Sequence, residues 1–216
     1  MKTKIFDLTP KISPRLGVFP GDQKFERHVA LSMKSGSHLE LSAMRSTVHL
    51  GAHADAPSHY HRDGADISQR PLHLYLGKAQ VIRVNIAKGA RVEIRDVRAP
   101  VQAPRVLIDT GSFPEPEKWN SDFSSFSPEL LEWLADQGVK LVGIDTPSVD
   151  PEDSKGLEAH QILWKHDLAV LEGLCLKGVP EGVYTLSALP LPIEDGDASP
   201  VRAVLLPYCP ALDELE

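Results

Sequence analysis

The sequence has few cysteines, no long apolar run and no excess of basic residues, and each absence excludes a class of protein. Its 216 residues include two cysteines, Cys175 and Cys209, which are too few for a disulfide framework and do not form a Cys-x-x-Cys motif. No stretch approaches the roughly 18 apolar residues that a membrane span needs. The formal net charge is −7, so binding to nucleic acid or to an anionic membrane is not expected.

Several enzyme motifs are also missing from the sequence. It has no Gly-x-Ser-x-Gly elbow, which disfavours serine-hydrolase chemistry, and no dinucleotide- or phosphate-binding glycine motif. Lys2 and Lys4 are not followed by an apolar segment, so a secretory signal is not expected and we predict a cytoplasmic location. The length and the 42% apolar content predict one globular domain over residues 1–216.

The most informative stretch lies between residues 49 and 59. Its odd positions hold His49, His53, Asp55 and His59, whereas its even positions hold Leu50, Ala52, Ala54, Ala56 and Ser58. Alternate side chains of an extended chain point to the same side, so the polar groups would face one way. Imidazoles and carboxylates are common ligands of divalent zinc, manganese and iron. The stretch therefore predicts a metal site.

Two other interpretations of this stretch are less favoured. The spacing His49-x-x-x-His53 also matches the ligand pair on zinc-protease helices, but Gly51 and Pro57 weaken a helix and no glutamate follows His49. A polar loop with solvated histidines would be a sufficient explanation for a single histidine. It does not explain four candidate ligands that all occupy odd positions.

Glu172 and His160 extend the candidate site. Glu172 interrupts the apolar residues 168–176, a predicted strand, and a buried carboxylate there is costly unless it is paired or binds a metal. The alternative is an edge strand on which Glu172 points to water. His160 lies in a predicted helix over 155–164 and is informative because, with Glu172, it would supply the ligands of a second metal.

Two metals that share a carboxylate favour a hydrolase, because they acidify a bound water and polarise a carbonyl oxygen. An uncoordinated histidine nearby could then protonate the leaving group. His59, the last polar residue of the stretch, is the candidate for this role.

The remainder of the chain alternates predicted strands with at least two helices, which indicates an α/β or α+β fold. Strands are predicted over 5–8, 25–33, 38–44, 78–86, 105–109, 139–144, 168–176, 183–189 and 201–206. The clearest helix opens at Ser127-Pro128-Glu129, a favourable N-cap and first turn, and ends at Gly138. The almost wholly apolar strand 139–144 is expected near the centre of a sheet.

The string His49-x-Gly-x-His53-x-Asp55-x-Pro57-x-His59 resembles the metal-dependent cyclase family. Residues 18–22, 141–151 and 198–204 further resemble its kynurenine formamidase branch, and the similarity runs from about residue 5 to about residue 207. This resemblance implies a swivelling β/β/α fold of the α/β class in a homodimer or higher homo-oligomer. It also implies two divalent metal ions, usually zinc, with manganese as an alternative.

The resemblance also implies a role for each candidate residue. His59 would donate and accept the proton, and Phe19, on the loop 14–22, would contact the aromatic substrate. The implied reaction is hydrolysis of N-formyl-L-kynurenine to L-kynurenine and formate in tryptophan breakdown. The implied metal ligands, with Asp55 and Glu172 shared between the two ions, are His49, His53, Asp55, His160 and Glu172.

Two departures from the family pattern bear on the substrate and the site. Leu50 stands where the family often has threonine, and Phe19 stands where the formamidases usually have tryptophan. Phenylalanine keeps a stacking face but loses area and the indole N–H, which affects substrate range more than chemistry. The alternatives are a relative that hydrolyses a cyclic amide such as isatin or another aryl formamide, and a metal-binding module without catalysis.

Overall fold

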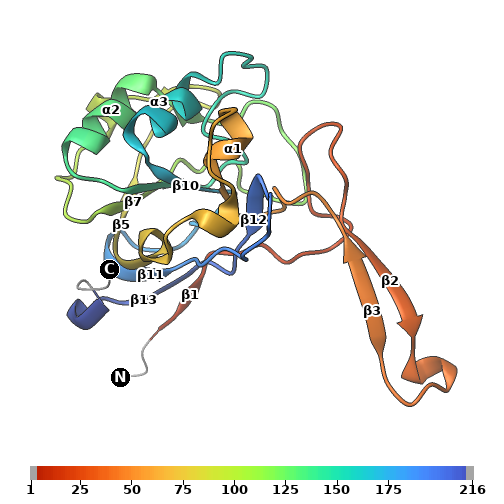
Figure 1. Ribbon diagram of the computed structural model, residues 1–216. Helices are drawn as coiled ribbons and strands as arrows, with labels where there is room; N and C mark the ends of the chain where they lie inside the picture. Colours follow the sequence, from red (N-terminus) through yellow and green to blue (C-terminus); the bar gives the residue numbers. More distant parts are fainter. Residues whose placement is uncertain (1–3, 213–216) are drawn as a thin grey trace.

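The computed structural model describes residues 4–212, and nine of its strands form one mixed sheet (Figure 1). In sheet order these strands are β1 (Phe6–Asp7), β13 (Val204–Pro207), β11 (Gly182–Ser187), β5 (Leu76–Arg83), β7 (Arg105–Asp109), β9 (Leu141–Ile144), β10 (Ala169–Glu172), β4 (His53–Asp55) and β12 (Ala198–Pro200). The strands β5, β7, β9 and β10 are parallel, and the pairs outside them are antiparallel. Strand β9 is buried between two neighbours, as its apolar sequence predicts.

The sheet separates two apolar cores. One core gathers small and branched side chains from almost every strand, from Leu205 on β13 to Ala54 on β4, so the sheet curls around it. The other core lies under the helices α2 (Pro128–Asp136) and α3 (Glu158–His166), which cover the opposite face together (Figure 1). The predicted α/β class is therefore confirmed.

The helix ends follow from local chemistry. The Ser127 side chain accepts a hydrogen bond from the backbone N–H of Leu130, and Pro128 occupies the first turn of α2, as predicted. Helix α3 begins three residues later than expected, at Glu158. Both carboxylate oxygens of Asp150 accept backbone hydrogen bonds there, from Ala159 and His160, so a residue outside the helix caps its first turn.

Two small sheets complete the architecture. The pair β6 (Arg91–Val92) and β8 (Ser125–Phe126) borders α2, and β2 (Glu26–Leu31) pairs with β3 (Leu41–Arg45) in a hairpin. The hairpin projects away from the remainder of the fold, and all of its strand residues are exposed (Figure 1). The sequence predicts these two strands but not their separation from the main sheet.

Three-residue and four-residue 3-10 turns lie at Met33–Ser35, Ile67–Gln69, Leu72–Tyr75, Ile94–Asp96 and Pro210–Leu212. Within residues 4–212, no helix has both the length and the apolar character required to cross a membrane. The cytoplasmic location stays a prediction.

Candidate metal centre and substrate pocket

The alternation of polar and apolar residues predicts one extended strand over 49–59, but the structure differs. Only β4, His53–Asp55, is extended, Gly51 adopts a φ of +61°, and Pro57 opens the four-residue helix α1 (Pro57–Tyr60), which carries His59. The small side chains at positions 50, 52, 54 and 56 are nevertheless buried, as expected. The histidines reach the site from a bend, a strand and a helix rather than from one strand face.

Sheet register brings Glu172 to this stretch. Strand β10 runs antiparallel to β4, with Glu172 opposite His53. The next residue, Gly173, has a φ of +65°, and a Cβ atom there would lie 2.1 Å from the carbonyl oxygen of Gly51. Glycine is therefore required for this close approach. Helix α3 packs against the sheet next to β10 and contributes His160.

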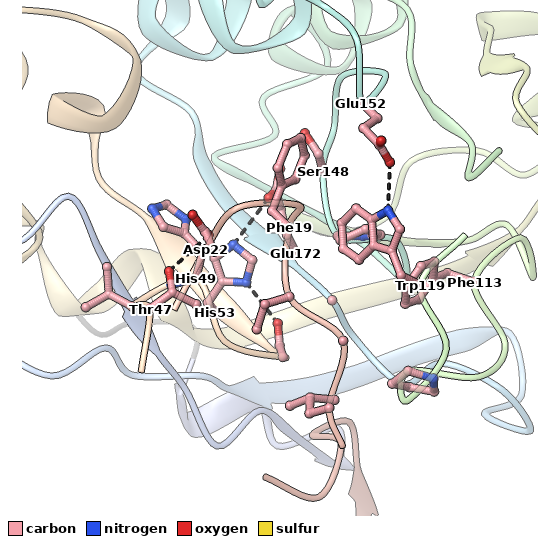
Figure 2. A pocket seen from close by; sticks show the side chains of 18 of the residues that line it. Phe19, Asp22, Thr47, His49, His53, Phe113, Trp119, Ser148, Glu152 and Glu172 are labelled. Carbon is pink, nitrogen blue, oxygen red and sulfur yellow. Dashed lines mark hydrogen bonds and ion pairs between the residues drawn. The ribbon is translucent and has the colours of Figure 1, made fainter. Parts of the chain in front are cut away.

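Three imidazoles and two carboxylates converge at this point, and Figure 2 shows His49, His53 and Glu172 of this group. The Nδ1 atom of His49 and the Nε2 atom of His53 lie 2.9 and 3.3 Å from Asp55 Oδ1. His53 Nε2 also lies 3.3 Å from Glu172 Oε2. His49, His53 and Asp55 offer ligand atoms close enough to one another to hold one ion, and Glu172 borders this first potential ligand group through His53.

A second group uses the other oxygen of each carboxylate. The Nε2 atom of His160 lies 3.5 Å from Asp55 Oδ2 and 3.7 Å from Glu172 Oε1. Asp55 and Glu172 therefore each place one oxygen near a histidine of each group. All five side chains that the sequence selects as ligands are brought together.

Buried polar atoms without hydrogen-bond partners indicate that these residues fit a cation. His53 Nε2, both carboxylate oxygens of Asp55, and His160 Nε2 are buried and have no hydrogen-bond partner of adequate geometry. Buried polar atoms without partners are costly, and cations bound in the two ligand groups would satisfy all four. Ligand atoms about 2.0–2.1 Å from a tetrahedral zinc ion are roughly 3.3–3.4 Å apart. The observed separations of 2.9–3.7 Å bracket that value.

Outer hydrogen bonds fix which nitrogen each histidine directs at the site. The Nδ1 atom of His53 lies 2.9 Å from the carbonyl oxygen of Gly51, which can only accept, so in the neutral ring Nδ1 carries the proton and Nε2 keeps its lone pair. His160 Nδ1 lies 2.8 Å from Asp150 Oδ2, with the same consequence. The backbone N–H of Val149 donates to Glu172 Oε1 over 2.7 Å and orients that carboxylate.

Without a cation, protons compensate the buried carboxylates. Burial lowers the pKa of His53 and of His160, but the carboxylates of Asp55, Glu172 and Asp150 outweigh burial and raise both pKa values to about 10. Burial opposes ionisation of Asp55, yet the adjacent His49 and His160 hold its pKa well below the usual range. A divalent ion must displace protons from these imidazoles when it binds.

His59 lies at the edge of the cluster. Its ring centroid is 4.2 Å from that of His49, and its side chain is one-third exposed, whereas those of His53 and His160 are buried. An imidazole that is accessible from the pocket and adjacent to the ligands can exchange protons with a bound molecule. His59 is also close enough to Asp55 and His160 to share an ion with them.

Asp197, which sequence analysis does not select, contacts two of these histidines. Its Oδ2 atom lies 3.0 Å from His49 Nε2 and 3.5 Å from His59 Nδ1. The available sequence signal is its position directly before the stretch 198–204, which resembles the family. Nothing in the local sequence links residue 197 to residues 49 and 59.

A cavity of about 500 Å³ opens above the cluster, and its wall is aromatic. Phe19 lies edge-on to Trp119 with ring centroids 5.4 Å apart, and Trp119 contacts Phe113 in the same way at 5.7 Å. The indole N–H of Trp119 donates to Glu152 over 2.7 Å (Figure 2). Phe19 thus lines the pocket of its own chain. Trp119 and Phe113, both on the loop 112–124, are pocket residues that no sequence pattern indicates.

The pocket is lined by acidic rather than basic side chains. Its lining includes the carboxylates of Asp22, Glu152 and Asp145, but among the described residues no lysine or arginine lines it. Asp145 is held by hydrogen bonds from the backbone N–H groups of Thr110 and Gly111, and burial raises its pKa to about 6. A ligand with a cationic group is therefore favoured over a purely anionic one.

The sequence is similar to members of one family. The model of the family Cyclase matches residues 6–151. A kynurenine formamidase of Erythrobacter litoralis is 43% identical over 203 residues, which cover 94% of this chain and 93% of that protein. A kynurenine formamidase of Bordetella petrii is 40% identical over 204 residues, which cover 94% of this chain and 97% of that protein.

Solved structures share the fold. One described as a potential metal-dependent hydrolase with cyclase activity superposes with a TM-score of 0.83 at 26% identity, covering 97% of this chain and all of that one. Isatin hydrolase A of Labrenzia aggregata superposes with a TM-score of 0.76 at 20% identity, covering 96% of this chain and 94% of that one. The second similarity concerns the fold alone.

Proposed function

This chain belongs to the Cyclase family, and we propose that it is an arylformamidase that hydrolyses N-formyl-L-kynurenine to L-kynurenine and formate, the reaction named for its relatives. The observation that carries the proposal is the convergence of unpaired, buried ligand atoms at the base of an aromatic pocket. The first feature suits hydrolysis and the second suits an aryl substrate. We assign this activity to one cyclase-like domain over residues 1–216.

The proposed centre holds two divalent ions, with zinc the first choice and manganese the alternative. His49 and His53 would hold one ion and His160 would hold the other, with Asp55 and Glu172 shared between the two ions. When bound, such a pair acidifies a water molecule and polarises a carbonyl oxygen.

The chain's own groups perform the remaining work. His59, exposed to the pocket beside the cluster, would take a proton from the attacking water and deliver it to the aryl amine as it leaves. Asp150, Val149 and Gly51 keep the ligands oriented through their hydrogen bonds, so little reorganisation is needed during the reaction.

The pocket supports an aryl formamide with an amino-acid side chain. Phe19 and Trp119 provide apolar ring surface for the aryl group. Trp119 also supplies an indole beside the position where Phe19 replaces the family's tryptophan. The carboxylates of Asp22 and Glu152 suit the ammonium group of formylkynurenine. Leu50 is 3% exposed and packs with Leu16 and Val18 away from the ligands, so its difference from the family leaves the site intact.

The alternatives are a hydrolase for isatin or another aryl formamide, and a metal-binding module without catalysis. A direct comparison separates them: steady-state kinetics of the zinc- or manganese-loaded protein on formylkynurenine, formanilide and isatin. We expect the highest kcat/KM on formylkynurenine, loss of activity with a chelator, and recovery on addition of metal. A higher kcat/KM on isatin would contradict the substrate assignment, and metal binding without any turnover would contradict the enzyme assignment.

We further propose that the protein forms a homodimer through the β2–β3 hairpin. A lone two-stranded hairpin is marginally stable in water, and this one exposes apolar side chains such as Val29, Leu41 and Met44, the last 75% exposed. Met44→Glu should shift the molar mass measured by light scattering toward the monomer, whereas Arg45→Glu, on the same strand, should not. An unchanged mass for Met44→Glu would contradict the role of the hairpin.

A further inference from the structure

The backbone fixes Asp197 next to the ligand strand. Strand β12 pairs antiparallel with β4, so that Ala198 lies opposite Asp55. The carbonyl oxygen of Asp197 accepts a hydrogen bond of 2.9 Å from the backbone N–H of Ala56. Ala56 directly follows β4 and Asp197 directly precedes β12, so the backbone at Asp197 is tied to the end of the ligand strand.

From this position the carboxylate of Asp197 bridges two imidazoles. One oxygen, Oδ2, lies 3.0 Å from His49 Nε2 and 3.5 Å from His59 Nδ1. His49 directs its other nitrogen at Asp55 Oδ1, at 2.9 Å, so Asp197 occupies the outer side of that ring. The carboxylate of Asp197 is half exposed and lies at the mouth of the cluster, whereas Asp55 is buried within it.

We propose that Asp197 is a positioning residue for His59, an inference that rests on the hydrolase function proposed above. A carboxylate can only accept a hydrogen bond, so Asp197 stabilises the form of His59 with its proton on Nδ1. Nε2 then keeps the lone pair that takes a proton from water. The same carboxylate stabilises the imidazolium formed in that step, until His59 returns the proton to the leaving amine. The 3.5 Å separation is the long contact common before substrate binds.

The competing role for Asp197 is that of a metal ligand, since His49, His59 and Asp197 are close enough to hold an ion together. The two roles predict different results. A ligand loses metal when it is substituted, whereas a positioning residue loses turnover with its metal retained. Asp197→Asn keeps the size of the side chain and removes the charge, so it separates the two without leaving a cavity.

The first test is a double-mutant cycle on the metal-loaded protein, with metal content measured for each variant. Asp197→Asn should lower kcat on formylkynurenine by about 10–100-fold, the usual effect of losing such an outer partner, and should retain its metal. In the His59→Asn background, Asp197→Asn should change kcat by no more than about twofold, because the group it acts on is gone. Asp195→Asn, an exposed neighbour with the same charge change, should behave as wild type.

Equal effects of Asp197→Asn in both backgrounds would overturn the proposal, and so would loss of metal from the single variant.

The second test does not depend on activity. In protein labelled with ¹⁵N-histidine and loaded with zinc, the His59 signals are identified by their absence in His59→Asn. The chemical shifts should show a protonated Nδ1 in wild type and a shift toward the other tautomer in Asp197→Asn. Identical His59 shifts in the two proteins would refute the inference, even if formylkynurenine were not the substrate.

Discussion

Replacing Asp150 should separate the stability of the fold from the affinity of the metal centre. Asp150 is fully buried and accepts three hydrogen bonds: one of 3.0 Å at Oδ1 from the Ala159 backbone, and two at Oδ2 from the backbone and Nδ1 of His160, of 3.1 and 2.8 Å. An asparagine can direct its amide oxygen at His160 and keep both contacts there. Its NH₂ group then faces the Ala159 N–H, and one contact is lost.

The magnitudes follow from these contacts. A hydrogen bond to a charged group contributes about 1.5–3 kcal/mol, so Asp150→Asn should lower the free energy of unfolding by about 1–3 kcal/mol. Asp150→Ala leaves all three donors unsatisfied and should cost about 3–5 kcal/mol, the usual penalty for breaking a buried charge pair. Only the alanine variant frees His160 Nδ1, so only it should lower metal affinity, by about 10–100-fold.

Urea denaturation in the presence of a chelator would measure the stabilities, and titration against a competing chelator would measure the affinities. Asp153→Asn is the matched control, because its carboxylate lies on the same loop and is exposed. Wild-type metal affinity in Asp150→Ala would refute the argument that this hydrogen bond orients His160. If that variant fails to fold, a change below about 0.5 kcal/mol in Asp150→Asn would refute the energetic part.

Three further substitutions test the remaining roles. Asp55→Asn should lose bound metal and activity together, since Asp55 presents one oxygen to each ligand group; metal analysis that finds two full equivalents would contradict a shared ligand. His59→Asn should keep its metal while kcat falls by about 10²–10⁴-fold, the usual contribution of general acid–base catalysis, and loss of metal would instead make His59 a ligand. Phe19→Ala should lower kcat/KM for formylkynurenine at least several-fold, because an aromatic contact contributes about 0.5–1.5 kcal/mol beyond buried area, with little change for a small non-aromatic formamide. An equal loss on both substrates would show that the Phe19 ring serves the structure of the loop.

Local patterns predict much of the fold because their causes are local. The start of α2 follows from the side-chain cap of Ser127 and the fixed φ of Pro128, and the central position of β9 follows from its apolar sequence. The prediction of a single extended stretch over 49–59 is wrong on both sides of β4, because the chain bends at Gly51, whose φ is +61°, and Pro57 starts a helix. Alternation describes only β4. His49 reaches the site from a bend before this strand, and His59 reaches it from the helical turn after it.

The sequence by itself determined the chemistry of the centre: which imidazoles and carboxylates are present, and that His53 and Asp55, two residues apart on a strand, face the same way. Only the tertiary structure decided which distant groups complete it. Asp197 reaches His49 and His59 because β12 pairs with β4, Asp150 reaches His160 because it caps α3, and Trp119 meets Phe19 because two loops pack together. These contacts join residues 10 to 148 positions apart. Strand register and core packing set them, and neither leaves a periodic signal around the residues concerned.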